Sequence, residues 1–188
     1  MDGLILYLHG FCSSPASWKA RLLGEEMTRR GLAARFVCPA LSPVPAQAIA
    51  DLSRFLDSVG RPVTLIGSSL GGHYASYLAA QFGLPAALIN PAVVSALSAE
   101  QFIGEHANFH SGERFVFTAE HAAQLAAQVA RPDPARLWLL LETGDEVLDY
   151  RAAQAHWFGS RQSVFEGGDH SFTRFPELMP QLIEFAGL

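Results

Sequence analysis

The stretch VTLIGSSLGGHYASYLAA, residues 63–80, contains a serine placed to act as a nucleophile. The spacing of Gly67, Ser69 and Gly71 matches the pattern G-x-S-x-G. Ser68 does not fit the central position, because the pattern would then require glycine in place of Ile66. Ser69 is therefore the candidate nucleophile.

The residues on either side of Ser69 predict a strand that enters a helix through a tight turn. Residues 63–66 form a short apolar run typical of a buried strand, and residues 70–80 have helical apolar spacing. A strained turn of this kind lifts the central hydroxyl clear of the sheet. The positions two before and two after the serine approach each other closely, which explains their glycines, and the helix N-terminus directs N–H groups toward the hydroxyl.

A serine hydroxyl is a weak nucleophile and needs a base, which a third group orients. In a strand–turn–helix setting of this kind the chain order is serine, then Asp or Glu, then histidine. Of the seven histidines, His170 in EGGDHSF directly follows the last predicted strand, so His170 is the candidate base. His73 lies one turn into the nucleophile helix, where we expect a packed or solvated side chain.

The orienting acid is expected just after the fifth predicted strand, where the sequence offers Glu142, Asp145, Glu146 and Asp149. Asp145 lies in the turn past the strand and is the candidate acid. Asp149 is expected to begin the next helix, where capping alone favours a carboxylate, and Glu142 to belong to the strand. Asp169, next to His170, is expected to shape the loop.

Two backbone N–H groups are expected to stabilise the negative charge that develops on a carbonyl oxygen under attack. One belongs to Leu70, which follows the nucleophile, and the other to Phe11 in the loop HGFCSS. Gly10 allows the backbone of that loop to approach closely. His9 is expected to brace the loop or to line the substrate pocket, and Cys12, which has no base of its own, to be a small packed residue.

The elements that must position these residues alternate between strand and helix along the chain. Alternation of this kind predicts an α/β fold: one domain over residues 1–188, with about six mostly parallel strands and helices on both faces. Ligands bind such sheets beyond the carboxyl ends of the strands. Strands are expected within 4–8, 34–41, 63–66, 85–92, 136–145 and 162–168, and helices within 14–30, 42–60, from 70 onward, 118–130, 151–158 and 175–186.

Composition excludes several classes of partner. The 188 residues carry a net charge of −5 without any block of basic residues, so we expect no nucleic-acid partner. No segment approaches the roughly 20 apolar residues of a spanning helix, so we expect no membrane insertion. The start of the chain is typical of a first strand rather than a signal peptide. Cys12 and Cys38 form no metal pattern, which favours free thiols in a cytoplasmic protein.

Four blocks of sequence resemble the α/β-hydrolase superfamily, and within it the small bacterial YqiA-like esterases: LYLHGFCSSPASWKA, IGSSLGGHYASYLA, TGDEVLDY and GGDHSF. The resemblance implies a compact hydrolase sheet without the two strands that precede the oxyanion loop in larger members. It also implies hydrolysis of small-molecule carboxylic esters or acyl thioesters by Ser69, Asp145 and His170, with no cofactor and no metal. Cys12, Trp18 and His73 depart from the pattern we expect and could alter the pocket.

Residues 92–135 are too many for a plain crossover. Thr118 is expected to cap the crossover helix, which runs to about Ala130 and leaves residues 92–117 before it. We interpret this segment as a small cap whose Phe102 and Phe109 line a substrate pocket. The alternative is that its phenylalanines, which include Phe115 and Phe117, anchor the segment to the core.

Other functions use the same triad. An amidase or peptidase, a C–C hydrolase and an acyltransferase remain open, because fold and triad do not fix the substrate. A non-catalytic binding protein on a hydrolase fold is the alternative of a different class.

Overall fold

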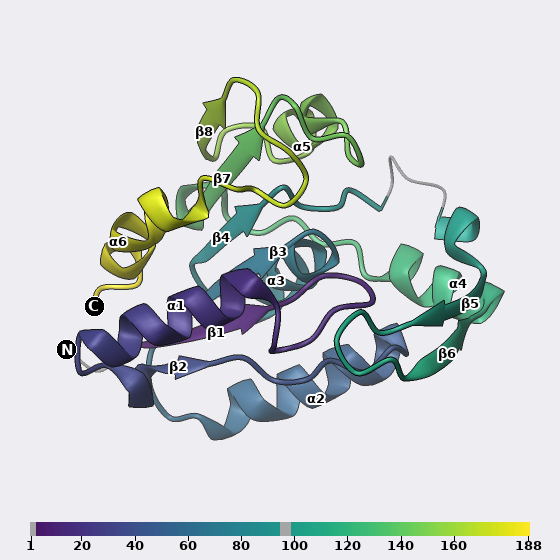
Figure 1. The fold of residues 1–188 in the computed structure, drawn as a ribbon, viewed down its shortest axis with the longest axis horizontal. Coiled ribbons are helices and arrows are strands. Elements are labelled where there is room, and N and C mark those ends of the chain that lie inside the picture. Colours follow the sequence, from purple (N-terminus) through teal and green to yellow (C-terminus); the bar gives the residue numbers. More distant parts are fainter. Residues whose placement is uncertain (1–2, 95–98) are drawn as a thin grey trace.

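A computed structural model describes residues 3–94 and 99–188 and contains a six-stranded sheet in which all neighbouring strands pair in parallel (Figure 1). The predicted α/β fold with a mostly parallel sheet of about six strands is confirmed. The spatial order is β2-β1-β3-β4-β7-β8. The strands are β1 (Leu4–Leu8), β2 (Phe36–Val37), β3 (Val63–Ser68), β4 (Ala86–Ile89), β7 (Leu137–Glu142) and β8 (Arg161–Phe165).

The order of the strands sets the place of the ligand crevice. The chain passes from β1 to β2 in one direction, then returns to β3 on the other side of β1 and continues through β4 and β7 to β8. In open α/β sheets, ligands bind at the carboxyl ends of the two neighbouring strands from which the chain continues toward opposite edges of the sheet. Here those strands are β1 and β3, whose ends pair Leu8 with Gly67.

Helices cover both faces of the sheet because alternate strand residues point to opposite faces. In β1, Leu4, Leu6 and Leu8 pack in one apolar cluster with α2, α3, α4 and α5, whereas Ile5 and Tyr7 pack in a second cluster with α1 and α6. The helices are α1 (Trp18–Arg29), α2 (Pro45–Ser58), α3 (Leu70–Phe82), α4 (Ala119–Ala127), α5 (Tyr150–His156) and α6 (Phe175–Phe185). Across the described ranges, no helix has the length and apolar character needed to cross a membrane.

Two elements near the N-terminus are shorter than predicted. The second strand contains only Phe36 and Val37, because Pro39 has no N–H with which to extend the pairing with β1. The first helix begins at Trp18 rather than near Ser14. Ser14 instead closes a turn: its Oγ accepts from the Ala16 N–H at 3.0 Å, and its carbonyl from the Ser17 N–H at 3.0 Å.

The segment interpreted as a cap contains a β-hairpin that the sequence analysis did not predict. A 3₁₀ turn, η2 (Ala99–Phe102), leads to the antiparallel pair β5 (Gly104–Ala107) and β6 (Arg114–Phe117). Asn108 Oδ1 forms the hairpin turn by accepting from the N–H groups of His110 and Ser111. Thr118 caps α4 as predicted, and the helix ends at Ala127, slightly earlier than expected. Residues 95–98 of the segment lie outside the described residues.

Candidate active site

Ser69 lies in a strained turn between β3 and α3. Its backbone has φ 55° and ψ −121°, in a region that side chains other than glycine rarely occupy. The Ser69 N–H donates to the Ile89 carbonyl at 3.0 Å, and the Ser69 carbonyl accepts from the N–H groups of Gly72 and Ala92 at 2.9 and 3.0 Å. Bonds to β4 and to the segment after it therefore hold the turn in this conformation.

The glycines on either side of Ser69 are required by close backbone contacts. A Cβ on Gly67 would collide with the backbone of Gly71, as the sequence pattern predicts. A Cβ on Gly71 would collide with the carbonyl of Leu8, at the end of β1. The second contact places the nucleophile turn directly against the strand that leads to the oxyanion loop.

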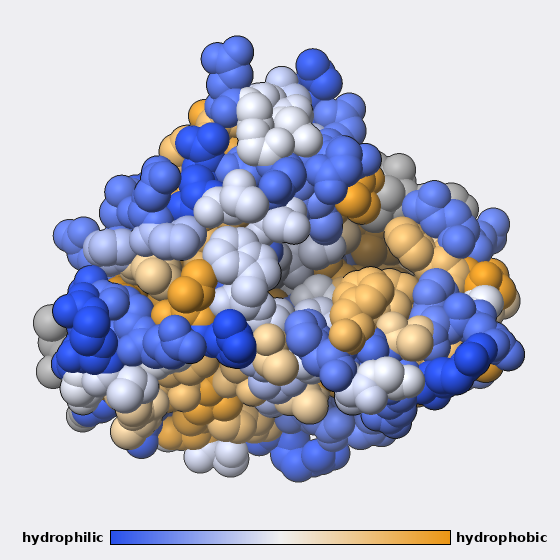
Figure 2. All heavy atoms as spheres, viewed as in Figure 1, coloured by the Kyte–Doolittle hydropathy of each residue, from blue (hydrophilic) through white to orange (hydrophobic). Residues whose placement is uncertain are grey.

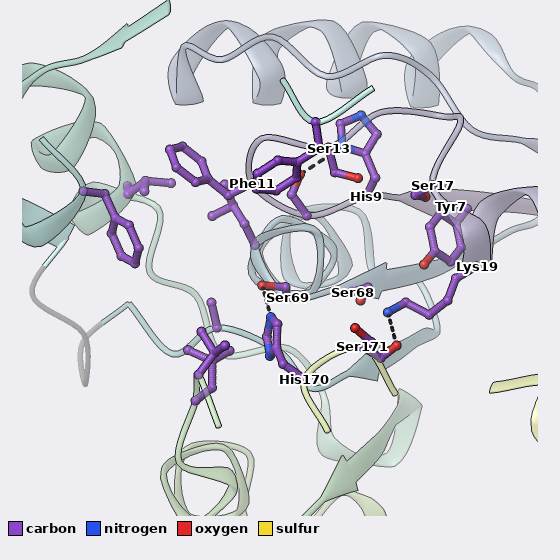
Figure 3. Close-up of a pocket in the computed structure, with 18 of the residues that line it drawn as sticks. Tyr7, His9, Phe11, Ser13, Ser17, Lys19, Ser68, Ser69, His170 and Ser171 are labelled. Atoms are coloured by element: carbon purple, nitrogen blue, oxygen red, sulfur yellow. Dashed lines mark hydrogen bonds between the residues drawn. The ribbon is translucent and has the colours of Figure 1, made fainter. Parts of the chain in front are cut away.

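The structure brings the three predicted triad residues together, and Figure 3 shows two of them, Ser69 and His170, side by side. His170 Nε2 lies 3.1 Å from Ser69 Oγ. His170 Nδ1 lies 2.8 Å from Asp145 Oδ2 and 3.0 Å from Oδ1. Ser69 follows β3, Asp145 follows β7 and His170 follows β8, so three separate crossovers place them at one edge of the sheet.

The surroundings of Asp145 keep its carboxylate charged. Its side chain is 2% exposed, and its Oδ1 accepts from the N–H groups of Val147 and Leu148 at 2.9 and 2.8 Å. Burial alone would raise the pKa of Asp145, but the hydrogen bonds from His170, Leu148 and Val147 outweigh it and lower the pKa below its ordinary value. A charged Asp145 can fix the His170 tautomer that carries its proton on Nδ1.

The competing carboxylates have other partners. Asp149 caps α5, where it accepts from the Arg151 N–H at 3.0 Å. Glu146 accepts from the backbone N–H of His170 at 2.9 Å, and Glu142 is fully buried at the end of β7. Among the carboxylates of the described ranges, Asp145 alone accepts from the His170 ring.

A buried polar network positions the His170 loop, and the sequence analysis did not identify it. Glu142 Oε2 accepts from the Asp169 N–H at 2.8 Å, while Glu142 Oε1 pairs with Arg174 Nε at 2.5 Å. Asn90 Nδ2 donates to the Asp169 carbonyl at 3.0 Å, and its Oδ1 accepts from the Glu142 N–H. A Cβ on Gly168 would collide with the Glu142 carboxylate. Gly167-Gly168 before the loop was the one local sign of this close approach.

The loop after β1 lies beside Ser69. A Cβ on Gly10 would lie 3.3 Å from Ser69 Cβ, so the loop passes directly beside the nucleophile. Across residues 3–94 and 99–188, neither the Phe11 N–H nor the Leu70 N–H donates to a protein acceptor. Both donors are therefore free for a ligand oxygen.

His9 braces this loop and also lines the cavity, the two roles considered from the sequence. Its Nδ1 lies 3.0 Å from the Gly10 carbonyl, and its Nε2 accepts from the Leu41 N–H at 3.2 Å. Because Nε2 accepts, the proton is on Nδ1 and the ring is neutral. Burial lowers the pKa of His9, which agrees with a neutral ring.

A cavity of about 400 Å³ opens over Ser69 and His170, and Figure 2 shows the surface hollowed beside apolar side chains on this face. One part of it is apolar. Phe102, Phe109 and Phe117 line it, whereas Phe115 packs against Phe11 with ring centroids 5.7 Å apart. The other apolar lining residues include Val94, Ala99, Leu125, Val147 and Leu148.

The hairpin is attached to the loop after β1. The Phe109 N–H donates to the Cys12 carbonyl at 2.8 Å, and Asn108 Nδ2 donates to the Ser13 carbonyl at 2.6 Å. Phe117 is 1% exposed and belongs to the core as well as to the cavity. Phe109 is 79% exposed and stands at the cavity mouth. The segment thus has both features considered for it, pocket lining and attachment to the core.

A family model described as "Uncharacterised protein family (UPF0227)" matches residues 4–187. The chain belongs to this family. The match agrees with the resemblance to YqiA-like proteins seen in the sequence.

Solved structures similar to this UPF0227 chain are α/β-hydrolases, and they establish its fold. "Alpha/beta hydrolase domain-containing protein 10" from mouse has a TM-score of 0.72 at 19% identity, with 98% of this chain and 92% of that chain covered. A putative hydrolase from Agrobacterium vitis S4 has a TM-score of 0.74 at 17% identity, with 98% and 88% covered. A monoacylglycerol lipase from Paleococcus ferrophilus has a TM-score of 0.70 at 14% identity, with 98% and 93% covered.

Proposed function

We propose that this protein is a serine hydrolase that cleaves carboxylic esters or acyl thioesters through an acyl-enzyme. The observation that carries the proposal is the position of the His170 ring, with one nitrogen 3.1 Å from Ser69 Oγ and the other 2.8 Å from Asp145. This arrangement activates a serine hydroxyl by placing a base beside it and an orienting acid behind the base.

The first half of the reaction forms the acyl-enzyme. Ser69 Oγ attacks the carbonyl carbon while His170 Nε2 accepts the hydroxyl proton, and Asp145 stabilises the resulting imidazolium. The N–H groups of Phe11 and Leu70 stabilise the oxyanion, and the loss of one such donor typically costs about 10²–10³ in rate. The C–O or C–S bond then breaks, and His170 donates its proton to the departing alcohol or thiol.

The second half repeats the chemistry with water. His170 accepts a proton from a water molecule, which attacks the acyl carbon of the Ser69 ester. Collapse of the second tetrahedral intermediate returns the proton to Ser69 Oγ and releases the carboxylic acid. Each step uses only the chain's own groups, a carbonyl substrate and water.

The apolar part of the cavity supports an acyl substrate. Phe102, Phe109 and Phe117 line the same cavity as Ser69. We propose that η2 and the hairpin act as a cap on this single domain and cover the acyl chain. Several of the similar structures are of proteins named as esterases or lipases, one of them with bound ferulic acid, which favours ester over amide chemistry here.

A panel of substrates that share one acyl group tests the proposal. Butyrate is supplied as a p-nitrophenyl ester, an N-acetylcysteamine thioester and a p-nitroanilide, and kcat/KM is measured for each. We expect hydrolysis of the ester and the thioester, with the anilide much slower, because its amine leaves with greater difficulty. An anilide cleaved as fast as the ester would favour an amidase, and binding without product from any of the three would favour a non-catalytic protein.

A further inference from the structure

The cavity has a second, polar end that the reaction above does not use. Lys19, in the first turn of α1, lies there with 8% of its surface exposed and is the only lysine in the chain. Its Nζ donates to the Ser171 carbonyl at 2.7 Å. Within the described ranges, that hydrogen bond accounts for one of the three N–H groups of its ammonium.

Several hydroxyl side chains line the same end of the cavity as this amine. Figure 3 shows the side chains of Tyr7, Ser17, Ser68 and Ser171 on the same side of the cavity as Lys19. Ser17 Oγ is buried and has no hydrogen-bond partner among the described residues. A buried hydroxyl without a partner costs stability, and such groups in folded proteins call for a partner such as a ligand or water.

The ammonium of Lys19 has no contacting counter-ion. Among the described residues, no carboxylate oxygen lies within 4.0 Å of Nζ. The carboxylates near enough to act on Lys19 are Asp169, Glu142 and Asp145, of which Glu142 pairs with Arg174 and Asp145 with His170. Asp169 acts most strongly of the three, and its Oδ1 is buried without a hydrogen-bond partner among the described residues, but it does not contact Nζ. Buried charges are normally paired, so a buried cation that faces a cavity is a site for an anion.

The protonation of Lys19 agrees with this interpretation. Burial lowers the pKa of Lys19 to about 8, and the three neighbouring carboxylates oppose that change. The amine is therefore mostly protonated at neutral pH. An arginine would stay protonated even when buried, whereas burial lowers the pKa of a lysine toward neutral pH.

The polar end and the aromatic end lie in different directions from Ser69. In Figure 3, Lys19, Ser17 and Ser171 are to the right of Ser69 and His170, whereas Phe11 is above Ser69. Phe102 and Phe117 pack against Phe11, with ring centroids 5.7 and 5.5 Å from its ring. Ser69 attacks the carbonyl carbon of the substrate. The acyl chain and the leaving group extend from that carbon in different directions. With the acyl chain among the phenylalanines, the leaving group extends toward Lys19.

We propose that Lys19 and Ser17 form a subsite for a carboxylate carried by the leaving group of the substrate. The proposal rests on the proposed function for its assignment of acyl and leaving-group sides. The preferred substrate is then an ester or thioester whose alcohol or thiol product is itself an acid. Lys19 contacts that carboxylate through its unused N–H groups, and Ser17 donates its unpartnered hydroxyl.

Two matched pairs of esters test the subsite. The first pair is the butyrate esters of 4-hydroxybenzoate and 4-hydroxybenzamide, which differ in the charge of the leaving group. The second pair is mono-p-nitrophenyl adipate and p-nitrophenyl hexanoate, which differ in the charge of the acyl group. The measured quantity within each pair is kcat/KM of the charged ester divided by kcat/KM of the neutral ester. This ratio cancels losses that affect both members equally.

We expect Lys19→Met to lower the ratio of the first pair by about 10- to 100-fold, as for loss of a hydrogen bond to a charged group. Ser17→Ala should lower the ratio less. This variant breaks no internal hydrogen bond, so it still tests the subsite if Lys19→Met folds poorly. Arg21→Met is the matched control, because Arg21 is an exposed cation on the same helix. It should leave the ratio unchanged.

Two kinetic results would overturn the proposal. Equal losses for both members of the first pair would make Lys19 a structural link to Ser171. A larger change in the second pair would assign the carboxylate to the acyl side. Calorimetric binding of 4-hydroxybenzoate against 4-hydroxybenzamide needs no turnover, so it tests the subsite even if no ester is cleaved. Tighter binding of the acid that Lys19→Met abolishes supports the subsite, and equal binding of acid and amide contradicts it.

Discussion

Ser69→Ala is expected to abolish turnover almost completely, by about 10⁶ in kcat on the scale of serine protease triads. Alanine retains the backbone of the turn and removes the only atom that can form the acyl bond. His170→Ala should cost a similar factor, because without its base the hydroxyl is not activated. Since the two residues act as one unit, the double variant should be no slower than either single variant. Initial rates on p-nitrophenyl butyrate measure all three.

The matched control for these variants is Ser58→Ala, at the C-terminal end of α2, where the serine is exposed. Thermal unfolding should show all variants folded. Two outcomes would contradict the mechanism: activity that survives Ser69→Ala within a few-fold of the parent, or losses that multiply in the double variant.

Asp145→Asn is expected to lower kcat by about 10⁴, as in the protease template. The amide is nearly the same size as the carboxylate, but it carries no charge and can present N–H to His170. The ring then loses the partner that fixes its proton on Nδ1, so Nε2 no longer faces Ser69 as an acceptor. Because hydrogen bonds hold the pKa of Asp145 below its ordinary value, the carboxylate is charged throughout the neutral range. Rates at pH 7 and 8 should show the same loss.

Asp149→Asn provides the matched comparison four residues away. Asp149 caps α5 through its side chain, and asparagine is an equally good cap, so activity should be nearly unchanged. If Asp149→Asn were the damaging variant and Asp145→Asn the mild one, the acid would be assigned to the wrong residue.

Local sequence signals were sufficient to predict most of what positions the triad. Gly67 is required because the turn brings it against Gly71, a contact between neighbours in sequence. The alternation of strands and helices follows from apolar periodicity, and chain order then limits the base and the acid to positions after later strands. These features are encoded within a few residues of where they act.

The parts that could not be predicted depend on contacts between distant segments. The pairing of Glu142 with Arg174 and the bonds from Asn90 to the His170 loop join residues from three elements. The hairpin of residues 104–117 lacks the short Asn-Gly type of turn and is stabilised by its attachment to Cys12 and Ser13. Lys19 resembles any helix lysine until folding buries it beside Ser171.

The most direct test of the central claim is the intact mass of the protein after incubation with a fluorophosphonate, followed by peptide mapping. A fluorophosphonate reacts with a serine that an adjacent base activates, whether or not the natural substrate is known. The account predicts a single adduct on Ser69, absent from Ser69→Ala and greatly slowed in His170→Ala. A folded protein that gains no adduct, or gains it on another residue, would contradict the assignment of Ser69 as an activated nucleophile.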